Sequence, residues 1–193
     1  MVEDVLDVAL LVGAAIDAVG GEYFVGGSVA SSLQGEPRAT NDIDMVVAML
    51  GHRVLAFASK LGSDFEVDQA MLREALSRGG SANIFYLPMV TKVDIFGLGD
   101  SPYDEIEFAR RRRVRVRTSG EELWVKSPED TILRKLLWYR AGGEVSEKQW
   151  RDVVEVIRIR GPQLEDDHLD TWASRLDLVT LLARARSSAA QSR

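Results

Sequence analysis

Two spacings of hydrophobic residues run through the first 126 residues of the chain, one typical of helices and one typical of strands. Helical spacing covers 5–19, 51–61 and 68–77, each ending close to a glycine, and shorter helices are expected at 28–33 and 103–110. Alternating or wholly apolar short runs predict strands at 23–25, 42–47, 65–67, 84–87, 93–96, 114–117 and 123–125. Helices interspersed with strands predict an α/β fold of the α+β kind, a mixed β-sheet flanked by helices.

The chain after residue 126 carries helical patterns alone. Ser127 is a favourable helix cap, and Pro128 follows at the first helical position, which proline prefers. Apolar stripes at helical spacing continue beyond it and are separated by Gly142-Gly143 and by Gly161-Pro162. We therefore predict an α/β core at 1–126 and a C-terminal helical bundle at 127–193 that packs on this core.

Two stretches carry candidate chemistry. Gly26 and Gly27 follow a short predicted strand and permit a tight turn into a helix that Ser28 can cap, which makes an anion site of the helix N-terminus. Thirteen residues later, Asp42 and Asp44 stand at the start of an apolar strand. Residues two apart on a strand point to one side and lie about 6.5 Å apart. Unless a cation lies between them, repulsion disfavours two ionised carboxylates, and all-oxygen sites of this kind usually hold Mg²⁺ or Mn²⁺.

A phosphate site followed by paired carboxylates is what metal-dependent phosphoryl or nucleotidyl transfer requires. Gly27-Ser28, the spacer of thirteen residues and Asp42-Ile43-Asp44 resemble the motif of the polymerase-β-type nucleotidyltransferase superfamily. That superfamily takes a third carboxylate from a neighbouring strand, and Asp94 in the run Lys92-Val93-Asp94-Ile95-Phe96 is the candidate. The resemblance implies the minimal nucleotidyltransferase fold.

The resemblance extends to bacterial nucleotidyltransferase-like proteins related to AbiEii-type abortive-infection toxins and covers roughly residues 20–185. It implies that Lys135 faces phosphate and that Asp152 is its acidic partner on the following helix. The other matching positions are Gly35, Arg38, Thr40, the arginines at 110–113, Ser127-Pro128-Glu129-Asp130 and Arg151.

The resemblance also implies a role for each candidate residue. Asp42, Asp44 and Asp94 would hold one or two Mg²⁺ or Mn²⁺ ions, and Asp94 would help to deprotonate the attacking hydroxyl. The other expected roles are binding of the β- and γ-phosphates by Gly26, Gly27 and Ser28, neutralisation of developing charge by Lys135 and Arg38, and completion of the nucleotide site by Thr40 and Asp152.

The most basic stretch comprises Arg110 to Arg113, with Arg115 and Arg117 following. One interpretation is an edge strand that its charge protects from aggregation. The other is a groove for a triphosphate or an RNA backbone, because alternation along a strand places Arg113, Arg115 and Arg117 on one side. The sequence leaves both interpretations open.

Composition narrows the classes of function. Without cysteine there are no disulfides, no thiolate catalysis and no cysteine zinc site, which fits a reducing cytoplasm. The two histidines, His52 and His168, support neither a histidine nucleophile system nor a histidine metal cluster. The acidic N-terminus is unlike a signal peptide, and no apolar run approaches a membrane span, so we expect a cytoplasmic protein that does not enter a membrane. The net charge of −6 restricts any RNA-binding surface to a local patch.

We therefore predict an enzyme that transfers a nucleoside monophosphate from a nucleoside triphosphate to a hydroxyl acceptor. The acceptor is an RNA end, a protein or a small molecule, and the sequence does not decide among them. A toxin-like role with a cognate antitoxin belongs to the same resemblance. The alternative is a nucleotide- or nucleic-acid-binding module with weak catalysis, as one component of a toxin–antitoxin pair, although three clustered carboxylates favour chemistry over binding alone.

Overall fold

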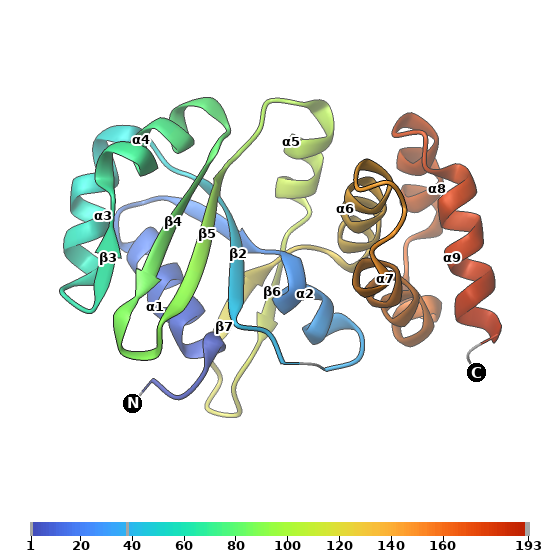
Figure 1. Ribbon diagram of the computed structural model, residues 1–193, viewed down its shortest axis with the longest axis horizontal. Helices are drawn as coiled ribbons and strands as arrows, with labels where there is room; N and C mark the ends of the chain where they lie inside the picture. The colour runs from blue at the N-terminus through green and yellow to red at the C-terminus, as the bar shows by residue number, and fades with distance from the viewer. Residues whose placement is uncertain (1, 38, 192–193) are drawn as a thin grey trace. The chain divides into compact units, whose positions relative to one another are not determined.

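The computed structural model describes residues 2–37 and 39–191 (Figure 1). The chain divides into two compact units. The first unit comprises Met1–Val29 with Thr40–Lys126, and the second comprises Ala30–Ala39 with Ser127–Arg193. Helix α2, Gly27–Gln34, has residues in both units. Nothing in the sequence pattern predicts that residues 30–39 belong with the C-terminal helices.

The first unit is built on a mixed sheet with the strand order β3-β4-β5-β2-β1-β7-β6 (Figure 1). Strand β2 is central and runs parallel to β5 on one side and antiparallel to β1 on the other. Strands β4 and β5 form an antiparallel hairpin, and β5 pairs with β2 on its other side. The strands are β1 Glu22–Val25, β2 Asp42–Ala48, β3 Phe65–Val67, β4 Ser81–Tyr86, β5 Thr91–Gly97, β6 Arg112–Arg115 and β7 Glu122–Val125.

One face of this sheet forms the core of the first unit. Strands β2, β4 and β5 alternate strictly between buried and more exposed residues, and Ile43, Met45 and Val47 are at most 1% exposed. The buried face packs on helices α1 and α4 so closely that a Cβ at Gly97 would lie 2.5 Å from the carbonyl oxygen of Ala75. The predicted mixed sheet flanked by helices is confirmed.

The helices of the first unit begin and end where the sequence predicts, within a few residues. Asp4 caps α1 by accepting the N–H groups of Leu6 and Asp7, and Ser101 forms a capping box with Asp104 at α5. The helical pattern at 51–61 is a 3₁₀ turn, Gly51–Arg53, that leads into α3. The helices are α1 Val5–Ala18, α3 Val54–Leu61, α4 Gln69–Arg78 and α5 Pro102–Ala109, and a second 3₁₀ turn spans Leu87–Met89.

The second unit is helical. Ser127 caps its first long helix by accepting the N–H of Asp130, and Pro128 stands in the first turn, as the sequence predicts. Asp130 is fully buried, with one carboxylate oxygen 2.6 Å from Ser127 Oγ and the other 2.9 Å from His168 Nε2, which ties α6 to α8. The helices are α6 Pro128–Ala141, α7 Glu147–Arg160, α8 Asp166–Arg175 and α9 Val179–Gln191, with a 3₁₀ turn at Gly161–Gln163.

Across residues 2–37 and 39–191, every helix is too short or too polar to cross a bilayer.

Candidate functional site

Three acidic residues lie on one face of the central strands of the first unit. Asp44 of β2 and Asp94 of β5 are register partners on adjacent parallel strands, which lie about 4.8 Å apart in such a pair. Asp42 stands two residues before Asp44 and therefore faces the same side. Asp42 is exposed, whereas the Asp94 side chain is 16% exposed and Asp44 is half-buried. The structure brings together the three residues that the sequence singles out as metal ligands.

Lys92 lies among these carboxylates. It is the register partner of Asp42 and stands two residues before Asp94, so its side chain shares their face of the sheet. Its Nζ donates to Asp94 Oδ2 at 2.8 Å. This hydrogen bond, followed by the negative charges of Asp94, Asp42 and Asp44, raises the pKa of Lys92 above its ordinary value despite some desolvation. Lys92 therefore remains charged at neutral pH and offsets part of the negative charge.

The carboxylates are not prearranged as a metal centre. Among the residues that the structure describes, no group of three or more histidine and acidic side chains is placed as it would be around one ion. Lys92 holds one oxygen of Asp94.

The turn from β1 into α2 is built against Asp44. The N–H of Gly26 donates to the Asp44 carbonyl at 2.8 Å, which ties the turn to β2. Gly27 has a φ of +52°, in the left-handed region that other residues rarely adopt. A Cβ at Gly27 would lie 1.7 Å from Asp44 Oδ2, so the carboxylate occupies the space that a side chain would need.

Helix α2 begins at Gly27, one residue before the predicted helix at 28–33. The left-handed φ of Gly27 lets the chain pass directly from strand to helix, which places Ser28 inside the first turn. The predicted cap position of Ser28 is therefore wrong. The start of the helix, where N–H groups and the helix dipole favour anions, nevertheless lies beside the Asp44 carboxylate.

Lys126 is a buried lysine at the same turn. Strand β7 runs parallel to β1, and the N–H of Lys126 donates to the Val25 carbonyl at 3.0 Å. Its Nζ lies 2.8 Å from Glu107 Oε1 on α5, and the two side chains are 7% and 4% exposed. A Cβ at Gly26 would lie 3.6 Å from this Nζ. A buried ion pair therefore supports the glycine turn from the side of α5.

The second unit holds the other predicted pair. Lys135 Nζ donates to Asp152 Oδ2 at 2.9 Å, and Ser31 Oγ donates to the same oxygen at 3.1 Å. All three side chains are buried. The acidic partner that the resemblance implies for Lys135 is thus in contact with it. A cavity of about 210 Å³ adjoins this cluster and is lined by Ser31, Glu36, Pro37, Arg151, Asp152 and Glu155.

Two further residues, Arg38 and Thr40, are predicted from the sequence to bind the nucleotide. Thr40 Oγ1 donates to the Asp42 carbonyl at 3.3 Å and so supports the start of β2. Arg38 lies outside the described residues.

The arginine-rich strand differs from its prediction. Strand β6 ends at Arg115, so Arg117 is not on it and does not share a strand face with Arg113 and Arg115. Arg113 lies 3.6 Å from Glu122 and stacks over Trp124, with 5.1 Å to the ring centroid. Arg115 is exposed. Binding of phosphate by these arginines stays a prediction.

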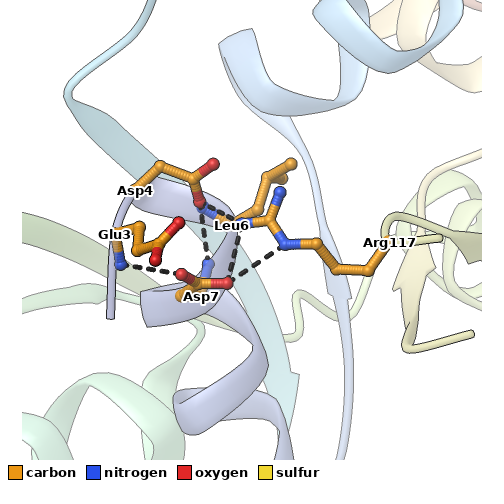
Figure 2. Close-up of polar contacts among 5 residues, drawn as sticks. All are labelled: Glu3, Asp4, Leu6, Asp7 and Arg117. Carbon is orange, nitrogen blue, oxygen red and sulfur yellow. Dashed lines mark hydrogen bonds and ion pairs between the residues drawn. The ribbon is translucent and has the colours of Figure 1, made fainter. Parts of the chain in front are cut away.

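Arg117 instead binds the N-terminal turn of α1 (Figure 2). Its guanidinium contacts Asp4 and lies 2.7 Å from Asp7 Oδ1, while Asp7 Oδ2 accepts the N–H of Glu3 at 2.8 Å. That backbone hydrogen bond and Arg117 lower the pKa of Asp7, and the two carboxylates raise the pKa of Arg117. The charge of Arg117 therefore stabilises the helix start.

No protein-family model and no curated protein matches the sequence of this chain. Solved structures do match. The solution structure of the antibiotic-resistance factor ANT(2″)-Ia aligns with a TM-score of 0.54 over 94% of this chain and 99% of that chain, at 14% identity. The chain has the nucleotidyltransferase fold.

Two further structures share this fold. An antigenic nucleotidyltransferase-like protein from Paracoccidioides brasiliensis aligns with a TM-score of 0.54 and 18% identity, covering 94% of this chain and 91% of that chain. ANT(2″)-Ia in complex with adenylyl-2″-tobramycin aligns with a TM-score of 0.52 and 14% identity, covering 86% of this chain and 93% of that chain. Identities this low establish the nucleotidyltransferase fold alone, and the relationship to AbiEii-type toxins stays a prediction.

The sequence patterns predict no functional role for two lysines, Lys92 and Lys126. The position of Lys92 could be predicted, because it precedes Asp94 by two residues and a strand must place both on one face. The position of Lys126 could not be predicted, since its place beside Gly26 depends on the parallel pairing of β1 with β7.

Proposed function

We propose that the protein is a metal-dependent nucleotidyltransferase that moves a nucleoside monophosphate from a nucleoside triphosphate to a hydroxyl acceptor and releases pyrophosphate. The observation that carries this proposal is the register pairing of Asp44 with Asp94, with Asp42 on the same face and the Gly27 turn against Asp44. A turn that suits anions and a group of carboxylates thus meet within one unit. The nucleotidyltransferase fold supports the same reaction class.

The residues present fit a hard divalent cation. Asp42, Asp44 and Asp94 offer only carboxylate oxygens, which Mg²⁺ and Mn²⁺ prefer. Because Gly27 has no side chain, the Asp44 carboxylate fits against it; a side chain at position 27 would occupy that space. When bound by these three residues, Mg²⁺ or Mn²⁺ would supply charge stabilisation for the phosphates and activate the acceptor hydroxyl.

The chain's own groups would divide the remaining work. The Gly27 backbone and the Ser28 hydroxyl would bind the β- and γ-phosphates at the start of α2, where the helix dipole favours negative charge. Gly26, whose N–H donates to the Asp44 carbonyl, would hold this phosphate-binding turn against β2. Asp94 would take the proton of the attacking hydroxyl. The buried Lys126–Glu107 pair would hold the glycine turn in place. The further nucleotide contacts proposed from the family resemblance are Arg38, Thr40, Lys135 and Asp152.

The acceptor is proposed only as a class. An RNA end, a protein hydroxyl and a small-molecule hydroxyl all suit the reaction. The ANT(2″)-Ia complex contains adenylyl-2″-tobramycin, so the small molecules of the cell extract form one of the acceptor fractions to be tested. A toxin-like role with a cognate antitoxin rests on the AbiEii-type resemblance alone.

The test uses the full chain with Mg²⁺ and each nucleoside triphosphate, labelled at the α-phosphate, together with total RNA and cell extract. We expect label in one acceptor fraction, and no label after chelation or with Asp44→Asn. The matched control is Asp100→Asn, an exposed carboxylate beyond the other end of β5 that should label as wild type does. Binding of triphosphate without labelling of any fraction would instead support the alternative, a binding module.

A further inference from the structure

The neighbours of Lys92 on β2 are acidic, whereas its neighbours on β4 are uncharged. On β4, the strand that flanks β5 on its other side, its register partner is Phe85 and the partner of Asp94 is Asn83, both uncharged. On β2 its register partner is Asp42, and Asp44 follows two residues later. The charged groups that Lys92 meets on this face therefore belong to β2 and β5, and its ammonium contacts Asp94 at 2.8 Å.

Electrostatics gives this arrangement a consequence for the free protein. Three carboxylates in adjacent positions repel one another, and a cation among them relieves that repulsion. The ammonium of Lys92 is such a cation, and it occupies one of the two Asp94 oxygens through which a divalent ion could bind.

We propose that Lys92 is the resident counter-ion of Asp42, Asp44 and Asp94, and that a divalent metal ion must displace its ammonium from Asp94 in order to bind. The inference rests on the proposed function only in taking these carboxylates as the metal ligands. Lys92 then stabilises the metal-free protein and weakens metal binding by the same contact, so its removal has opposite effects on the two properties. If the role of Lys92 were purely structural, its removal would lower stability and leave metal affinity unchanged.

The experiment compares wild type with Lys92→Met and Lys92→Arg in the full chain. Mn²⁺ binding is measured by titration calorimetry at fixed ionic strength, and melting temperature is measured in chelator. Lys92→Met should bind Mn²⁺ about five- to tenfold more tightly, because an ion pair and a nearby repelling charge are both removed. Its melting temperature in chelator should fall by about 2–4 °C. Lys92→Arg should resemble wild type, and Lys92→Gln provides a second neutral variant if the methionine variant folds poorly.

The matched control is Lys60→Met, which removes the same charge from an exposed position on α3 and should change neither quantity. If wild type binds Mn²⁺ and Lys92→Met binds it no more tightly, the counter-ion role of Lys92 is overturned while the metal site stands. If wild type and Lys92→Met both fail to bind Mn²⁺, the metal site of the proposed function falls, and the role of Lys92 with it. Tighter binding that persists in a Lys92→Met/Asp44→Asn double variant would place the metal elsewhere and also overturn the inference.

Discussion

Replacing Gly27 with alanine changes the turn and the carboxylate site together. The φ of Gly27 is +52°, and the new Cβ would lie 1.7 Å from Asp44 Oδ2 and 2.5 Å from Asp44 Cγ. Two non-bonded heavy atoms do not approach this closely, so the Asp44 side chain or the turn itself must move. The matched control is Gly79→Ala at the end of α4, where φ is +64° and the nearest atom to the new Cβ, Gly99 Cα, lies at an ordinary 3.4 Å.

The control separates backbone strain from displacement of Asp44. A left-handed alanine costs about 1–2 kcal/mol, part of which is offset because alanine also restricts the unfolded chain by about 0.4–1 kcal/mol. Gly79→Ala should therefore lose about 1 kcal/mol of stability. Gly27→Ala adds a displaced or off-rotamer Asp44 at about 0.5–1.5 kcal/mol, so its total loss should be about 1.5–2.5 kcal/mol. A shift of about 1 Å at a catalytic group costs about 100-fold in rate, so activity should fall far more than stability does.

Guanidinium unfolding followed by circular dichroism measures the stability of both variants, and calorimetric titration with Mn²⁺ measures the carboxylate site. We expect Gly27→Ala to bind Mn²⁺ more weakly than wild type, whereas Gly79→Ala should bind as wild type does. Equal stability losses in the two variants, with unchanged Mn²⁺ binding in both, would refute the placement of Gly27 against Asp44.

Three further changes have expected outcomes of their own. Asp44→Asn should keep or raise the melting temperature in chelator, because it relieves carboxylate repulsion, while nucleotidyl transfer should fall by orders of magnitude; a large loss of stability with activity retained would show a structural residue. Lys126→Met should lower the free energy of unfolding by about 3–5 kcal/mol, because it leaves Glu107 buried without this partner. The double variant Lys126→Met/Glu107→Leu should recover part of this stability in denaturant unfolding, and no recovery would refute the pairing. Arg117→Gln should lower the free energy of unfolding more at pH 7 than in strong acid. The folded protein holds the pKa of Asp7 below its ordinary 3.8, so the ionised Asp7 stabilises the fold above pH 3.8 and loses this effect as the pH falls through the lowered pKa. A stability loss in urea unfolding that does not depend on pH would contradict the contact with Asp7.

Local patterns predict most of the elements of this fold. Short apolar runs that contain aspartate at 42–47 and 93–96 predict β2 and β5, and residues two apart then share one face of the sheet. Ser127 and Pro128 predict the start of α6 for an equally local reason. The predicted strand 114–117 is displaced because valine and arginine alternate through Arg117, whereas the pairing of β6 with β7 runs only from Arg112 to Arg115. Arg117 belongs to the connecting turn, where its carbonyl accepts the N–H of Gly120.

Contacts between distant segments are beyond the reach of these patterns. Asp94 is a candidate from its sequence, but its position opposite Asp44 depends on strand order and register, which alternation does not encode. Lys126 lies beside Gly26 because two strands about 100 residues apart pair in parallel. The inclusion of residues 30–39 in the helical unit likewise follows from packing, as in the contact of Ser31 with Asp152.

The most direct test of the proposed carboxylate site is anomalous scattering from crystals of the full chain grown with Mn²⁺ and a non-hydrolysable nucleoside triphosphate analogue. We predict manganese peaks bonded to oxygens of Asp42, Asp44 and Asp94, with the triphosphate at the Gly26–Gly27 turn and Lys92 Nζ no longer on Asp94. Manganese and triphosphate bound elsewhere, with the Lys92–Asp94 pair intact, would contradict it.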